Sequence, residues 1–190
     1  MVERRDLPLF AWGDALRTAR ATRRRVVRRS VFVGLGCACL AATVAAPPLP
    51  RLVWNASASA PLGLYRVAPG ERVRRGDMVI ARTPIAVRGL AAGRRYIPAN
   101  VPLVKRAAGV PGDTICAVGT TISINGRPVA TRRTNDARGR RLPWWSGCRT
   151  LRDGAVFLLM GKILDSFDGR YFGPTAADDL IGKATAIWVR

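Results

Sequence analysis

Hydrophobic and polar positions follow two different patterns along this chain of 190 residues. Residues 30–46 form an uncharged, mostly apolar run, which predicts a helix because it is too long for an ordinary strand. Beyond residue 50, apolar residues occur in short runs separated by Gly, Pro, Asn or Asp. Short runs between turn residues are typical of β-strands. The pattern therefore predicts one N-terminal helix followed by a mainly β domain.

Eight segments after the helix carry the strand pattern. They are residues 64–67, 77–82, 103–108, 114–118, 121–124, 127–130, 155–160 and 184–189. Asn125-Gly126 lies between two of them and favours a two-residue hairpin turn. Two stretches, 83–102 and 132–146, match neither helix nor strand, and their length suggests functional or variable surface insertions.

The apolar run is predicted to span a membrane. Seventeen uncharged residues cover about 25 Å as a helix, slightly less than the ~30 Å hydrocarbon core. Arg28 and Arg29 can extend to the headgroups, so that Val26 and Val27 lengthen the span. We therefore expect a basic cytoplasmic segment at 1–25, a transmembrane anchor at 26–46 and an exported domain at 47–190.

Two alternatives to an anchor are a cleaved signal peptide and a buried core helix. Pro47 follows the best small-residue cleavage site, Val44-Ala45-Ala46, and makes cleavage there unfavourable. The arginines that precede the run are unusual for a core helix. Seven arginines lie in residues 10–29 but only two in 47–66, so the N-terminus is predicted to be cytoplasmic. This predicts a single-pass membrane protein whose domain after the anchor is exported; in a bacterium it would be an inner-membrane protein with a periplasmic domain.

The cysteines agree with export. Cys37 and Cys39 lie in the apolar run, whereas Cys116 and Cys148 are the two cysteines of the predicted exported part. An even number in an oxidising compartment makes Cys116 and Cys148 a disulfide candidate.

Composition excludes several kinds of chemistry. The chain has no histidine, which removes a Ser-His-Asp triad, a Cys-His pair and a histidine metal site. The formal charge of +20 would suit nucleic acid or an anionic membrane. Beyond residue 30, however, the arginines are scattered among strand-like segments, so we expect the lipid bilayer as a partner and no specific nucleic acid. No cofactor is suggested.

Three segments could carry chemistry: NASASAPLGLY (55–65), VKRAAGVPGD (104–113) and SFDGRYFGP (166–174). Taken singly, each is typical of an ordinary feature, namely a linker, a solvated strand residue and a turn with an ion pair. A serine nucleophile without histidine needs another base, and arginine does not deprotonate in proteins. Lysine can serve only if its pKa falls well below about 10.4. On a strand, Lys105 would share an apolar face with Leu103 and Ala107, where burial lowers that pKa.

Together and in this order, the three segments resemble the boxes of the signal peptidase clan, most closely the TraF-type conjugative transfer signal peptidases. The resemblance extends from about Val26 to Val189 and implies a signal-peptidase-like β-rich catalytic domain. It also implies a role for each matching residue: Ser59 as nucleophile, Lys105 as general base, Ser166 orienting the lysine, Asp168 and Arg170 as a structural ion pair, and Ser57 as an oxyanion-hole hydroxyl.

One departure from general leader peptidases favours the conjugative branch: Ser59-Ala60-Pro61 is one residue shorter than their Ser-Met-x-Pro. Gly169 stands where leader peptidases commonly have serine, and the conjugative branch also tolerates glycine there. The resemblance implies a membrane-bound serine endopeptidase that cleaves, or cyclises, an exported precursor such as a conjugative pilin.

Several alternatives remain open at this stage. They are a housekeeping preprotein signal peptidase, a catalytically inactive homologue acting as a pilus or secretion assembly factor, a self-cleaving repressor and a basic membrane protein that binds transferred DNA. Residues 1–25 are too short for the DNA-binding domain of a repressor.

Overall fold

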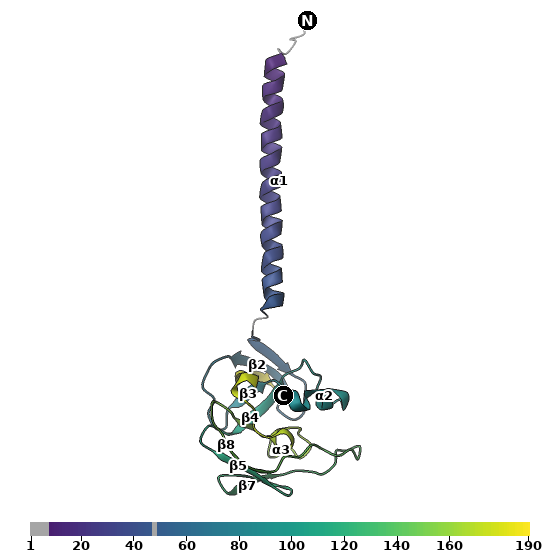
Figure 1. The fold of residues 1–190 in the computed structure, drawn as a ribbon, viewed down its shortest axis with the longest axis vertical. Coiled ribbons are helices and arrows are strands. Elements are labelled where there is room, and N and C mark those ends of the chain that lie inside the picture. Colours follow the sequence, from purple (N-terminus) through teal and green to yellow (C-terminus); the bar gives the residue numbers. More distant parts are fainter. Residues whose placement is uncertain (1–7, 47–48) are drawn as a thin grey trace. The chain divides into compact units, whose positions relative to one another are not determined.

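The computed structural model describes residues 8–46 and 49–190, and the chain divides into two compact units at residues 48 and 49. Figure 1 shows a long helix in the first unit and a β-rich domain in the second. Part of the predicted cytoplasmic segment (1–7) and the two prolines after the anchor (47–48) lie outside the described residues.

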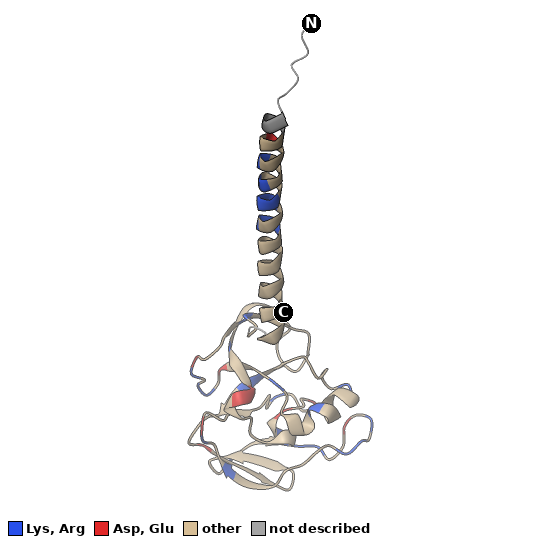
Figure 2. Ribbon diagram, turned by 45° about the horizontal axis from the view of Figure 1, so that its top comes forward, with Lys and Arg blue, Asp and Glu red and all other residues tan. Residues whose placement is uncertain are grey.

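Helix α1 (Pro8–Ala45) is the element of the first unit. It starts well before the predicted anchor, because the arginine-rich segment between residues 14 and 33 contains no Gly or Pro and arginine is a good helix former. Its 38 residues correspond to about 57 Å, more than a bilayer requires. The part Trp12–Ala45 is long and apolar enough to cross a membrane. Figure 2 shows the charged residues towards the N-terminal end of this helix, and in the sequence all of them precede residue 30.

The second unit contains two antiparallel sheets, which confirms the prediction of a mainly β domain preceded by one helix. The larger sheet has the order β1-β2-β10-β3-β4-β9, and the smaller has the order β7-β6-β5-β8. The strands are β1 (Leu52–Asn55), β2 (Gly63–Ala68), β3 (Met78–Ala81), β4 (Leu103–Gly109), β5 (Thr114–Val118), β6 (Thr121–Ile124), β7 (Arg127–Thr131), β8 (Gly147–Thr150), β9 (Phe157–Leu158) and β10 (Leu180–Val189).

The buried apolar side chains of the described domain form three clusters. In the larger sheet, Tyr65, Ile80 and Val104 pack together on one side. In the smaller sheet, Ile115 and Ile122 pack against residues that include Trp145 and Phe157. The alternation seen in the sequence sets these faces, since β2 buries every second residue. Cys116 and Cys148 are opposite each other in β5 and β8 and are joined by a disulfide with an S–S distance of 2.03 Å.

The hairpin at Asn125-Gly126 forms as predicted, with φ values of 50° and 77°. Other elements were not predicted. The stretch 83–102 contains helix α2 (Ile85–Gly93), which begins after Pro84 without a side-chain cap and so lacks the usual start signal. Strands β1 and β8 have four residues each and are largely exposed, and neither was predicted. The stretch 132–146 contains no helix or strand, only a bridge between Asn135 and Arg141. Helix α3 (Gly169–Phe172) and a 3₁₀ turn (Ala177–Asp179) complete the domain.

Candidate active site

The loop between β1 and β2 carries Ser57 and Ser59, and Asn55 fixes its shape. The buried amide of Asn55 donates hydrogen bonds to the carbonyls of Ser57 (3.0 Å), Ala60 (3.1 Å) and Pro61 (2.9 Å). Its oxygen accepts the N–H of Ser57 at 3.1 Å. One side chain therefore holds four backbone groups of the five-residue segment 57–61. Sequence reasoning gave Asn55 no role, although its place at the start of the serine-rich segment was a usable signal.

Lys105 projects from β4 towards this loop. Its Nζ lies 2.6 Å from Ser59 Oγ and 2.9 Å from Ser166 Oγ. The residue is only 3% exposed, and the adjacent Arg106 is exposed on the opposite face, as the strand pattern predicts. The structure thus brings together three residues that are 46 and 61 positions apart in sequence.

Burial controls the electrostatics of Lys105. It lowers the pKa of the ammonium group from 10.5 to about 8; Asp168 opposes this shift and Arg170 adds to it. Both Lys105 partners are neutral hydroxyls, and a hydroxyl accepts a hydrogen bond without supplying a negative charge. At pH 7 about one-tenth of the molecules would then carry the neutral amine.

Ser57 lies beside the Ser59 hydroxyl. The two Oγ atoms are 2.9 Å apart, and the Ser59 backbone N–H donates to Ser57 Oγ at 3.3 Å. The Ser57 hydroxyl and the Ser59 backbone N–H therefore lie close together, beside the Ser59 hydroxyl. These are the donor types that stabilise an oxyanion.

Asp168 and Arg170 form a buried ion pair behind Ser166. Both are 0% exposed, and the guanidinium donates to the carboxylate at 2.9 Å and 2.8 Å. Asp168 also accepts the backbone N–H of Met160 at 3.0 Å, while Arg170 donates to the carbonyl of Ile163 at 2.6 Å. Neither charged group has a hydrogen bond to Lys105, so the pair shapes the loop that presents Ser166.

The site opens into a cavity of about 690 Å³. Its walls include both stretches that the sequence left unassigned, together with the loop before α3. Tyr96 and Tyr171 pack against Phe167 with centroid separations of 5.1 Å and 5.8 Å, and they form an aromatic part of the wall. Within residues 8–46 and 49–190, no group of three or more His, Cys, Asp or Glu side chains gathers to hold a metal.

Comparison with known proteins places this chain in a family. The family described as "Signal peptidase, peptidase S26" matches residues 23–189. The chain therefore belongs to the S26 signal peptidases, a family of serine peptidases, as the resemblance implied.

Within that family the chain is similar to conjugal transfer proteins. It is 29% identical to the probable conjugal transfer protein TraF of Sinorhizobium fredii, over 87% of this chain and 93% of that protein. It is 32% identical to the conjugal transfer protein TraF of Agrobacterium fabrum, over 70% and 80% respectively. A signal peptidase I from Enterococcus faecalis has 20% identity and a TM-score of 0.36, covering 60% of this chain and 98% of that one.

Proposed function

We propose that this protein is a membrane-anchored serine endopeptidase that cleaves exported precursor proteins with a Ser59–Lys105 dyad. The observation that supports this most directly is the 2.6 Å contact between Ser59 Oγ and the amine of a lysine that is 3% exposed. A lysine in open solvent would be charged at neutral pH and could not accept a proton. Burial beside two hydroxyls supplies the environment that a lysine base needs.

The reaction is an acyl transfer. Ser59 Oγ attacks the scissile carbonyl carbon while neutral Lys105 takes the hydroxyl proton. The ammonium formed then protonates the leaving amine as the C–N bond breaks, leaving an ester on Ser59. Ser166, 2.9 Å from Nζ, keeps the amine directed at Ser59. Water, or an amine of the same substrate, attacks the ester and gives a linear or a cyclic product.

Ser57 is proposed to help hold the oxyanion. The Ser59 N–H now donates to Ser57 Oγ. Rotation of Ser57 would free that N–H and present a second donor, the hydroxyl, to the tetrahedral intermediate.

The substrate is proposed to be a pilin-like precursor used in conjugation. This rests on the similarity to proteins named for conjugal or plasmid transfer. The arginines before residue 30 support a cytoplasmic N-terminus, which would put the catalytic domain in the periplasm beside the bilayer. Precursors exported through the inner membrane would then meet the catalytic domain in the periplasm.

The test is cleavage by the full chain in membrane vesicles. A conjugative pilin precursor and a secretory preprotein are supplied in parallel, and products are measured by mass. We expect Ser59→Ala and Lys105→Arg to abolish cleavage, whereas the exposed controls Ser146→Ala and Lys162→Arg keep it. Preference for the secretory preprotein would indicate a housekeeping enzyme, and an inert wild type would indicate an assembly factor. Activity in Lys105→Arg would overturn the general-base role.

A further inference from the structure

The pocket contains a second cation besides Lys105. Among its described lining residues are Arg133 and two carboxylates, Asp136 and Asp165. The peptidase chemistry proposed above gives none of these three a role. The inference that follows rests on that proposed function, because it concerns how the same pocket selects its substrate.

The backbone of Arg133 is held on both sides. Its N–H donates to the hydroxyl of Tyr171 at 3.2 Å, and its carbonyl accepts from the indole of Trp144 at 3.1 Å. The preceding residue, Arg132, is 2% exposed and donates to the carbonyl of Gly119 at 2.8 Å and 3.0 Å. The backbone of Arg133 is therefore held in place, although it lies in a segment without helix or strand.

Asp136 does not form an ion pair with Arg133, because its carboxylate accepts hydrogen bonds from two other residues. It accepts from the Tyr96 hydroxyl at 2.5 Å and from Arg140 Nε at 2.7 Å. Arg94 also donates to the carbonyl of Arg141 at 2.5 Å. These bonds join residues 94–96 to residues 136–141, and we call this arrangement the clasp. Figure 1 shows α2 and the loop that follows β7 on the same side of the domain.

The carboxylate that pairs with Arg133 is Asp165, at 2.7 Å, but both side chains are partly in solvent. They are 48% and 74% exposed. Exposed pairs of this kind contribute little to stability, so a carboxylate from a bound peptide can replace Asp165 at little cost.

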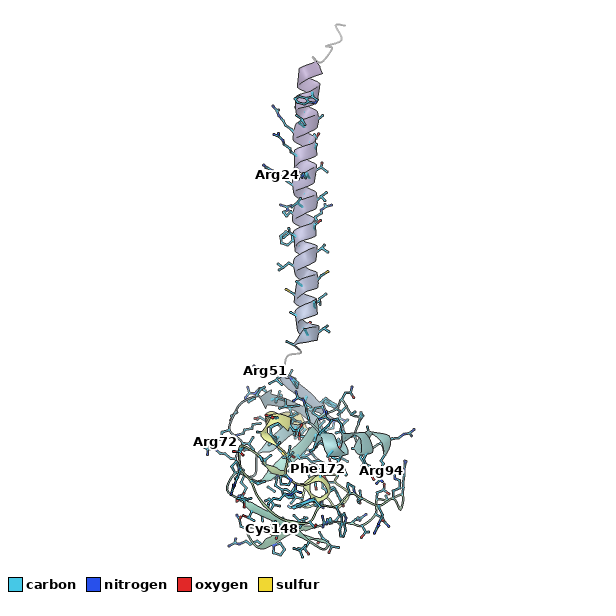
Figure 3. All side chains as sticks on the ribbon, viewed as in Figure 1. Arg24, Arg51, Arg72, Arg94, Cys148 and Phe172 are labelled. Carbon is cyan, nitrogen blue, oxygen red and sulfur yellow. A yellow bond between two sulfur atoms is a disulfide. The ribbon has the colours of Figure 1, made fainter. Side chains whose placement is uncertain are left out.

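The surroundings favour an anion as well. Within the described part of the domain, Arg94, Arg95, Arg138 and Arg141 have no carboxylate within 4.0 Å. Figure 3 labels Arg94, which follows the end of α2. A surplus of positive charge beside a pocket raises the local concentration of acidic ligands.

We propose that Arg133 binds an acidic side chain of the substrate close to the cleaved bond, and that Asp165 occupies Arg133 until the substrate arrives. Arg133 is thus a specificity residue, and the clasp positions the segment that carries it. The two residues should have opposite effects on selectivity: loss of Arg133 weakens the preference for acidic substrates, and loss of the Asp165 charge strengthens it.

The experiment uses the full chain in membrane vesicles and a precursor series. Each precursor carries Glu, Gln or Lys at one of the three positions on either side of the cleaved bond. At one or more positions we expect kcat/KM for Glu to exceed that for Gln about tenfold, and the ratio to shrink in 1 M salt. Arg133→Gln should bring the ratio near one, Arg133→Lys should restore part of it, and Asp165→Asn should raise it about threefold.

The matched control is Arg127→Gln, which removes one exposed positive charge from the smaller sheet and should leave the ratio unchanged. The double variant Arg133→Gln with Asp165→Asn should equal Arg133→Gln alone. Equal cleavage of Glu and Gln precursors at every position, or an unchanged ratio in Arg133→Gln, would overturn this inference and leave the peptidase function standing. If no precursor is cleaved, both proposals fail.

Discussion

Lys105 and Arg170 are two buried cations of the same domain, and they are stabilised in opposite ways. Lys105 is 3% exposed and its side-chain hydrogen bonds go to the hydroxyls of Ser59 and Ser166. Arg170 is 0% exposed and forms two hydrogen bonds with the Asp168 carboxylate. The first is buried without a charged hydrogen-bond partner, whereas the second is buried with one.

The difference separates a residue suited to proton transfer from a residue that stabilises the fold. Burial without a counter-charge favours the neutral amine, which is the form that can take a proton. Burial of a paired charge keeps both groups ionised and fixes the chain around them, but removal of one partner leaves the other uncompensated. We therefore expect changes at Lys105 to remove activity at little cost in stability, and changes at Arg170 to lower stability first.

Lys105→Met should give the largest effect. With the base removed, kcat/KM for precursor cleavage should fall about 10⁴-fold or more. The free energy of unfolding should stay the same or rise, because methionine fills a similar volume without a desolvated charge. Steady-state cleavage and urea unfolding of the same preparations measure the two quantities, with exposed Lys162→Met as the control. A clear loss of stability in Lys105→Met would break the contrast with Arg170.

Arg170→Met should come next, with a loss of about 3–5 kcal/mol in the free energy of unfolding, because Asp168 is left buried without its partner. The control is Arg88→Met. Arg88 pairs with Asp179 at 3.7 Å and is 28% exposed, so its loss should cost less than about 1 kcal/mol. If both variants unfold at the same urea concentration, the buried pair does not stabilise the loop.

The pH dependence of cleavage tests the proposed role of the buried, unpaired Lys105. In the proposed mechanism the neutral amine of Lys105 is the active form, and burial lowers the pKa of this group to about 8. Between pH 6 and pH 8, kcat/KM should therefore rise about 50-fold and then level off. A pH–rate profile on a substrate without titratable side chains near the bond measures this. A flat profile across that range would contradict a lysine base.

The same group links stability to pH. The folded-state pKa of Lys105 lies below the ordinary value of 10.5, so between about pH 8 and 10.5 the unfolded chain binds more protons than the folded one. Stability contributed by this residue should therefore increase with pH across that window. Lys105→Met should lack this increase, which urea titrations at several pH values would reveal.

Eight of the ten described strands and the position of Lys105 could be predicted because each depends on local alternation, whereas the short, largely exposed β1 and β8 could not. In β4, the period of two places Lys105 on the face of Leu103 and Ala107, and the burial agrees. The Ser59 and Ser166 contacts span 46 and 61 residues. Their pairing came from the family resemblance, since no local pattern encodes contacts across such separations.

The pocket wall could not be predicted for a physical reason. The clasp depends on side-chain bonds of Asp136 to Tyr96 and Arg140 rather than on a backbone ladder. Such bonds leave no period in the sequence. Asn55 likewise holds its loop through one amide, and α1 extends past its apolar run because arginine tolerates a helix as well as most residues do.

Gly169→Ala should give the smallest effect, and it tests the loop that holds Arg170. A Cβ at Gly169 would lie 2.7 Å from the carbonyl oxygen of Leu158 and 2.7 Å from Phe157 Cε2. The loop would have to shift, so we expect a loss of about 1–3 kcal/mol in unfolding free energy and reduced cleavage as Ser166 moves.

The control for Gly169→Ala has the opposite sign. Gly89 lies in α2, and apart from its own helix backbone and chain neighbours nothing lies within 4 Å of the position that an alanine methyl group would take there. Gly89→Ala should therefore raise stability by about 0.5–1 kcal/mol through helix propensity. Both variants are compared by urea unfolding.

The serine that leader peptidases commonly have at the position of Gly169 would meet the same two atoms, and this close approach explains why glycine suits this chain. Equal stability of Gly169→Ala and wild type would show that the loop yields easily, and the Asp168–Arg170 pair would then be a weaker constraint on Ser166 than its burial implies.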